Sequence, residues 1–165
     1  MISVTLGKMV SLCYNISIMK NYIVFDLEWN QSANGKERSI PHFPFEIIEI
    51  GAVKLNETFQ MVDEFHRLIR PQVYTQMHHA ISEVTHMDMK ELRNSGELFP
   101  DAAADFLSWC GGDAVFCTWG NMDLLELQRN MDYYHMDNPF PKPLFYYDVQ
   151  KLYGLFCREN ARISL

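Results

Sequence analysis

The chain has 165 residues, of which 48% are hydrophobic and 21% charged, and its formal net charge is −7 at pH 7. This composition is typical of one soluble globular domain, and it excludes a disordered chain and a strongly basic protein that binds nucleic acid by charge alone. A metal-dependent nuclease stays open, because bound cations reverse the local charge where acidic residues gather.

Cysteine usage favours a reduced, cytoplasmic protein. The four cysteines lie far apart without a C-x-x-C pair, which predicts neither a zinc site nor a disulfide framework; they are Cys13, Cys110, Cys117 and Cys157. No apolar run is long enough to span a bilayer. We expect residues 1–20 to form an N-terminal extension that does not hold the native start, with Met19 as the alternative start. Polar residues interrupt this stretch and disfavour a signal peptide.

The first predicted strand, Tyr22 to Trp29, ends in two carboxylates. Residues two apart in a strand point to the same side, so Asp26 and Glu28 stand within about 7 Å of each other. A divalent cation between them relieves the repulsion, and hard oxygen ligands suit Mg²⁺ or Mn²⁺. The alternative is a solvated strand end without a ligand.

Two further strands are predicted after a polar loop over residues 30–44. The segment Phe45 to Leu55 is a strong strand, and Thr58 to Ile69 follows it across a turn at Asn56 and Glu57. We therefore expect an antiparallel meander. The first strand is expected to be central, because its apolar residues do not alternate with polar ones.

The second half of the chain alternates predicted helices and short strands, as in a mixed α/β architecture. Gly111 and Gly112 end the second helix. The expected helices cover 79–92, 99–110, 122–136 and 148–157, and the expected strands cover 114–118 and 144–147.

A third carboxylate follows the predicted strand at 114–118. Asp123 lies at a strand-to-helix junction, where the ligand sites of α/β sheets gather. The alternative is that Asp123 only caps its helix or complements the helix dipole.

Three stretches together resemble the DEDD 3′–5′ exonucleases: F-D-L-E-W-N from Phe25, E-I-I-E-I-G-A-V-K-L from Glu46 and T-W-G-N-M-D-L-L-E-L from Thr118. Within that superfamily the chain looks most like the DEDDh branch, which includes ribonuclease T, the polymerase III proofreading subunit, the histone-mRNA and small-RNA exonucleases and bacterial sporulation-inhibitor relatives. The resemblance covers about 21–165. It implies an α/β, ribonuclease H-like mixed sheet, with an antiparallel meander and parallel strands flanked by helices.

The resemblance also implies a reaction. Asp26, Glu28 and Asp123 match the first two exonuclease motifs, and they would hold two divalent cations, Mg²⁺ or Mn²⁺. The family hydrolyses terminal phosphodiesters at the 3′ ends of single-stranded RNA or DNA and releases nucleoside monophosphates. The alternative is an exonuclease-like binding or regulatory module without catalysis. A strand transferase on the same fold is disfavoured by the second motif.

Further positions match substrate-binding segments of the family. The resemblance implies substrate contacts for the Leu27 backbone, Trp29, His79, Trp119 and Asn121, with Trp29 and Trp119 as stacking platforms unless they only pack in the core. His86 stands where the family usually has glycine. Other acids are assigned structural roles: Glu46 and Glu49 lie on opposite faces of their strand, and Asp148 caps the last predicted helix.

The family's last motif, H-x-x-x-x-D, is missing. It supplies the general base and a fourth aspartate. None of the six histidines lies in that pattern after Asp123. We therefore expect 21–165 to be an incomplete exonuclease domain that lacks the family's last helices, with impaired activity. An apolar surface left uncovered would favour a homo-oligomer.

Overall fold

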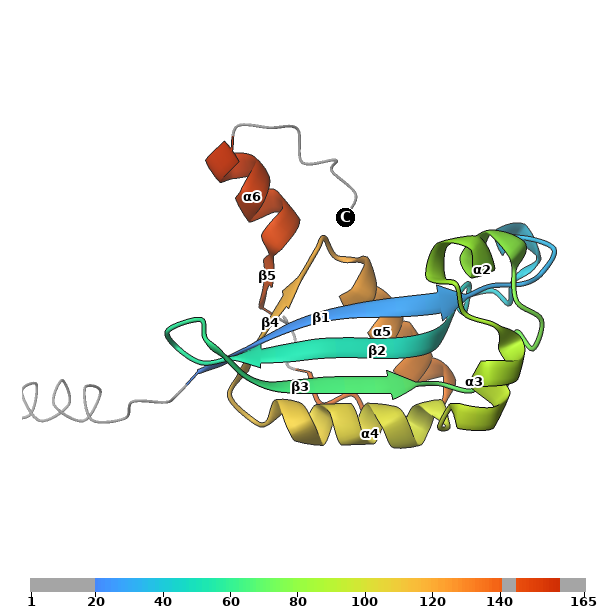
Figure 1. Ribbon diagram of the computed structural model, residues 1–165, viewed down its shortest axis with the longest axis horizontal. Coiled ribbons are helices and arrows are strands. Elements are labelled where there is room, and N and C mark those ends of the chain that lie inside the picture. Colours follow the sequence, from blue (N-terminus) through green and yellow to red (C-terminus); the bar gives the residue numbers. More distant parts are fainter. Residues whose placement is uncertain (1–19, 141–144, 158–165) are drawn as a thin grey trace, which may run out of the picture.

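The computed structural model describes residues 20–140 and 145–157, and in this part of the chain five strands form one sheet in the order β3-β2-β1-β4-β5 (Figure 1). Strand β1 pairs antiparallel with β2 and parallel with β4. The predicted mixed sheet with β1 at its centre is confirmed. The strands are β1 (Asn21–Asn30), β2 (Glu46–Leu55), β3 (Met61–Leu68), β4 (Ala114–Thr118) and β5 (Tyr146–Asp148).

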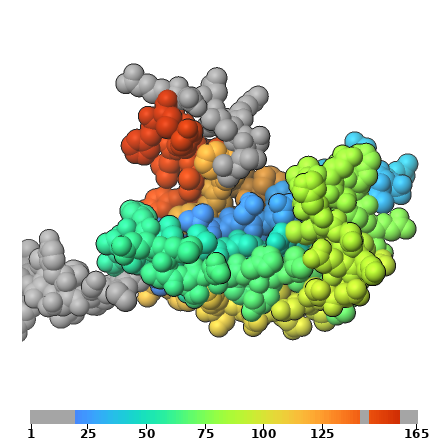
Figure 2. All heavy atoms as spheres, viewed as in Figure 1, coloured from blue at the N-terminus to red at the C-terminus, as the bar shows by residue number. Residues whose placement is uncertain are grey.

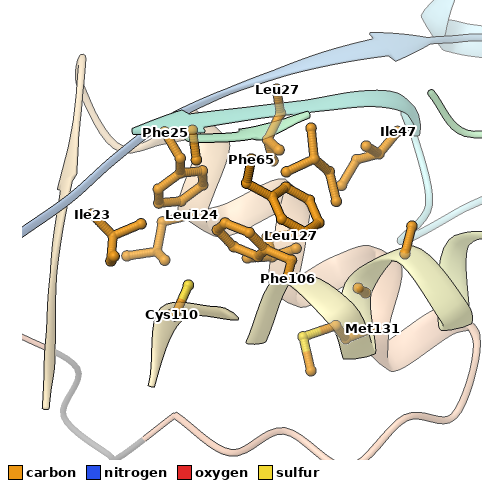
Figure 3. Packing of buried hydrophobic residues seen from close by; sticks show 14 of the residues in the cluster. Ile23, Phe25, Leu27, Ile47, Phe65, Phe106, Cys110, Leu124, Leu127 and Met131 are labelled. Carbon is orange, nitrogen blue, oxygen red and sulfur yellow. The ribbon is translucent and has the colours of Figure 1, made fainter. Parts of the chain in front are cut away.

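Two amphipathic helices, α4 (Phe99–Cys110) and α5 (Met122–Tyr133), cover one face of the sheet. Inward-facing residues of β1, β2 and β3 meet these helices in one core, because alternate strand residues share a face. Figure 3 shows Phe25, Phe65 and Phe106 in contact at its centre, with Leu127 beneath them. The predicted bounds of α4 and β4 agree with the structure.

The segment predicted as one helix over 79–92 is two short helices, so that prediction was wrong. Helix α2 (His79–Thr85) ends at His86, whose φ of 58° is left-handed, and α3 (Met89–Ser95) starts again after Asp88. Asp88 accepts a hydrogen bond from the backbone N–H of Glu91, which caps α3. Apolar spacing alone could not reveal this break, since the pattern continues through it.

The remaining differences are at element ends. Strand β3 begins at Met61 rather than Thr58, because Asn56 Oδ1 accepts the backbone N–H of both Thr58 and Gln60 and so forms the turn. Helix α5 ends at Tyr133. Helix α6 (Val149–Cys157) follows β5 directly, and Asp148 accepts the backbone N–H of Lys151, which confirms the predicted cap. Residues 1–19 and the predicted strand start at residue 144 lie outside the described part.

Buried amides fix the walls around the end of β1. Asn30 is fully buried and donates to the carbonyl oxygens of Tyr74 and Gln76, while its own oxygen accepts the N–H of His78. The segment that leads into α2 is thereby attached to β1. No helix in the described part is long and apolar enough to cross a membrane.

The second face of the sheet is not covered by α4 or α5. Figure 2 shows the blue β1 on the floor of a depression between the red α6 and the yellow-green region of α2 and α3. A short 3₁₀ helix, η1 (Lys36–Arg38), lies in the loop after β1. We call this second face the open face of the sheet.

Candidate active site

Strand alternation places two acids on the open face. Phe25 and Leu27 are each 3% exposed and point into the core, so Asp26 and Glu28 between and beyond them point the other way. The expectation that both acids share one side of β1 is confirmed.

Asp123 joins these acids from a distant part of the sequence. It lies in the first turn of α5, is 5% exposed, and its Oδ1 accepts the backbone N–H of Leu27 at 3.2 Å across a separation of 96 residues. Leu27 lies between Asp26 and Glu28 in β1. The carboxylate of Asp123 therefore points at β1 rather than only capping its own helix.

Mutual repulsion perturbs all three acids. Burial first, and then the charge of Asp26, raise the pKa of Asp123 to about 6. Burial and Glu49 raise the pKa of Asp26. The pKa of Glu28 is raised by burial, then by Asp26, Glu49 and Asp123. These shifts indicate excess negative charge of the kind that a bound cation compensates.

Glu49 is a fourth acid at this site, and the interpretation of Glu49 as merely structural was wrong. It lies directly opposite Glu28 in the β1–β2 ladder, and residues paired across antiparallel strands share a face. Its charge acts on both Asp26 and Glu28. The register needed to find it was not readable from the sequence, because a loop over residues 31–45 joins the two strands.

Glu46, by contrast, has the predicted structural role. Its side chain is 1% exposed and accepts the backbone N–H groups of Gln72, Val73 and Tyr74 together with the hydroxyl of Tyr134. This carboxylate attaches the segment after β3 to β2 and to the residue that follows α5.

His66 of β3 was missed by the sequence analysis. It pairs with Gly51 of β2, which pairs in turn with Asp26 of β1, so the three residues form one row across the sheet. The ring Nε2 of His66 is hydrogen-bonded to Glu49 Oε1. Sequence spacing could not reveal this histidine, because no acid follows it at the family's distance.

A cavity of about 610 Å³ lies against this row of residues. Its lining includes Asp26, Gly51, His66 and Trp119. Trp119 is half-buried, with its ring centroid 6.0 Å from that of Tyr153. It thus lies beside the acids, as the stacking prediction requires.

The other predicted substrate contacts border the acids less directly. The side chain of Leu27 is in the core while its backbone faces Asp123, and the half-buried ring of Trp29 lies 5.6 Å from that of Phe45. His79 is exposed at the start of α2, and Asn121 is exposed at the N-cap of α5. Their substrate contacts stay predictions.

The donor set suits hard divalent cations without forming a ready-made site. Within residues 20–140 and 145–157, no three His, Cys, Asp or Glu side chains converge as metal ligands. Asp26, Glu28 and Asp123 are nevertheless close enough to raise one another's pKa, and carboxylate oxygens are the ligands that Mg²⁺ and Mn²⁺ prefer. Small side-chain rotations are therefore needed for coordination.

Comparisons with known proteins agree with this geometry. The RNase T exonuclease family model matches residues 23–163. No curated protein matched the chain in a sequence comparison.

Among solved structures, the nuclease domain of 3′hExo, a DEDDh family member bound to rAMP, is 23% identical with a TM-score of 0.70, over 88% of this chain and 74% of that one. The cell-death related nuclease CRN-4 is 15% identical with a TM-score of 0.68, over 88% and 51%. E. coli exonuclease I in complex with a dT13 oligonucleotide is 13% identical with a TM-score of 0.66, over 81% and 28%. The fold is the ribonuclease H-like exonuclease fold, and the chain spans only part of each of these proteins.

Proposed function

The chain belongs to the RNase T family of 3′–5′ exonucleases, and we propose that it hydrolyses the terminal phosphodiester at the 3′ end of single-stranded RNA or DNA to release nucleoside monophosphates. The observation that supports this most is the hydrogen bond from the Leu27 backbone to Asp123. It holds an acid of α5 between the two acids of β1, as a site for cation-assisted phosphoryl chemistry requires.

In this proposal Asp26, Glu28 and Asp123 hold two divalent cations, Mg²⁺ or Mn²⁺. When bound, such cations lower the pKa of water and stabilise the charge on the leaving oxygen. The protein's own part is to keep three carboxylates together despite their repulsion, through the buried Leu27–Asp123 hydrogen bond and the paired strands β1 and β2.

The substrate class follows from the relatives and from the shape of the open face. 3′hExo is bound to rAMP in its structure, and E. coli exonuclease I is bound to a dT13 oligonucleotide. In this chain the terminal nucleotide would meet the Leu27 backbone, with His79 and Asn121 at its sides. Trp29 and Trp119 would stack on unpaired bases.

A binding or regulatory module without catalysis is the second candidate. It is favoured by one observation: no histidine after Asp123 is followed by an acid at the family's spacing. Loss of a general base typically costs about 10²–10⁴-fold in rate.

The test is a time course on 5′-labelled single-stranded RNA and DNA with Mg²⁺, Mn²⁺ or EDTA. We expect metal-dependent shortening from the 3′ end, at least about 100-fold slower in Asp26→Asn. Asp101→Asn, an exposed change on α4, is the matched control and should retain the rate. Equal cutting of a 3′-blocked substrate, or an unchanged rate in Asp26→Asn, would overturn the proposal. Binding without any cleavage would favour the module.

A further inference from the structure

His66 is the one histidine that the sheet itself brings to the acidic site. All six histidines lie in the described part of the chain, and the other five are in loops, at helix ends or in α2. His66 instead lies in β3, in the row that runs through Gly51 to Asp26. Its ring lines the same cavity as Asp26.

Glu49 fixes the orientation of this ring. Because the carboxylate of Glu49 accepts a hydrogen bond from Nε2–H of His66, the neutral imidazole keeps its lone pair on Nδ1. Glu49 itself lies opposite Glu28 in the ladder. A histidine oriented by a carboxylate beside a reaction centre is the arrangement that enzymes use to activate a nucleophile.

Gly51 leaves the space that the arrangement requires. A Cβ atom built on Gly51 would have only the backbone oxygen of Asp26 within 4 Å, at 3.9 Å. No side chain therefore stands between Asp26 and His66, and the cavity of about 610 Å³ extends over this gap. A water molecule and a phosphate group fit there.

We propose that His66, oriented by Glu49, accepts the proton of the water that attacks the terminal phosphodiester. This inference rests on the proposed exonuclease function and goes beyond the family's motifs, none of which includes His66. The charged groups around the ring are Glu49 on β2, Asp26 and Glu28 on β1, and Glu64 and Arg67 on β3; Arg67 Nη1 donates to the carbonyl oxygen of His66.

The step balances in atoms and charge. One O–H bond of water breaks, and its proton moves to Nδ1 of His66 while the water oxygen forms a bond to phosphorus. The bond between phosphorus and the 3′ oxygen of the preceding nucleotide breaks, and that oxygen leaves with the electron pair and takes up the proton from His66. The products are a nucleoside 5′-monophosphate and a strand with a new 3′ hydroxyl.

The test compares His66→Gln with His42→Gln, an exposed loop histidine outside the site. We expect His66→Gln to lower kcat about 10²–10⁴-fold with little change in KM, and His42→Gln to leave both unchanged. Added imidazole should restore part of the rate of His66→Gly. Because His66 is exposed, these variants should fold, and His66→Asn provides a second replacement.

Two readouts do not depend on turnover. Long-range ¹H–¹⁵N spectra should show the Nε2–H tautomer of His66 in the wild-type chain and its loss in Glu49→Gln, with recovery in Glu49→Asp. Calorimetry with AMP should give the same affinity for His66→Gln and wild type.

The outcomes separate this inference from the proposed function. If the wild-type chain cleaves, Asp26→Asn does not, and His66→Gln keeps the wild-type rate, the role of His66 is overturned while the exonuclease assignment stands. If the wild-type chain does not cleave under any metal condition, both fail. A mixed tautomer in the wild-type chain would overturn the role of Glu49.

Discussion

Folding changes the proton affinity of one carboxyl group in particular. Burial and Asp26 raise the pKa of Asp123 to about 6, whereas an aspartate in the unfolded chain titrates near about 4. The folded state therefore binds more protons between these two values, and stability falls as pH rises through this window. Above pH 6 the loss is complete and amounts to about 3 kcal/mol, since one pKa unit corresponds to about 1.4 kcal/mol.

Asp123→Asn should remove this loss. The amide oxygen can still accept the N–H of Leu27, so the hydrogen bond stays while the charge goes. In EDTA at pH 7 we expect the variant to be more stable by up to about 3 kcal/mol, with no gain at pH 4. Urea unfolding at both pH values measures this. An equal gain at pH 4 and pH 7 would show that ionisation is not the cause.

His86 holds a backbone conformation that suits glycine. Its φ of 58° and ψ of 12° form the left-handed end of α2, where the sequence comparison with the family had expected glycine. Such a conformation costs a non-glycine residue about 1–2 kcal/mol, and glycine loses about 0.5–1 kcal/mol through its greater freedom when unfolded. His86→Gly should therefore stabilise the chain by about 0.5–1 kcal/mol in thermal unfolding. Thr85→Gly, one residue earlier and helical, should destabilise it instead.

Among the elements, β2 depends on one buried carboxylate. Glu46 accepts backbone N–H groups from Gln72, Val73 and Tyr74, which have no other acceptor in this arrangement once it is lost. Glu46→Gln turns an amide NH₂ toward some of these donors and should cost roughly 2–4 kcal/mol in urea unfolding. The exposed Glu83→Gln on α2 is the control and should have little effect. Equal stability of the two variants would contradict this anchoring role.

The free edge of β3 is protected by its own side chains. The backbone N–H of Glu64 donates to Asp63 Oδ1, and the carbonyl oxygen of His66 accepts from Arg67. Unprotected edge groups pair readily with strands of other chains. A double change, Asp63→Ala with Arg67→Ala, should raise the sedimentation coefficient through self-association relative to wild type. The exposed pair Asp101→Ala with Lys90→Ala should leave it unchanged.

The sequence predicted elements better than the contacts between them. Helix α4 and strand β4 were correct because apolar spacing and the glycines after α4 mark their ends locally. The register of β1 against β2 depends on a long loop and on packing across the sheet, so no local signal placed Glu49 opposite Glu28. For the same reason His66 was not found, since it meets the site only through the pairing of three strands.

At the scale of the whole molecule, the site couples the two halves of the chain. Strand β1 and helix α5 are far apart in sequence, and the Leu27–Asp123 hydrogen bond joins them beside an uncompensated group of acids. The net charge of −7 adds to the local repulsion. A ligand that neutralises these acids should therefore stabilise the entire fold, because its binding energy is released only when both halves are in place.

Divalent cations provide that ligand, and their effect on unfolding is measurable without any substrate. At pH 7.5, Mn²⁺ at about 100 times its dissociation constant should stabilise the folded chain by about 2.7 kcal/mol, which raises Tm by roughly 5–10 °C for a chain of this size. The rise should shrink as the pH falls through 6, because protons then compete for Asp123. Asp26→Asn should abolish it, whereas Asp101→Asn should not. A similar rise with the Asp26 variant would mean that cations bind elsewhere, and the acidic cluster would then lose its assignment as the metal site.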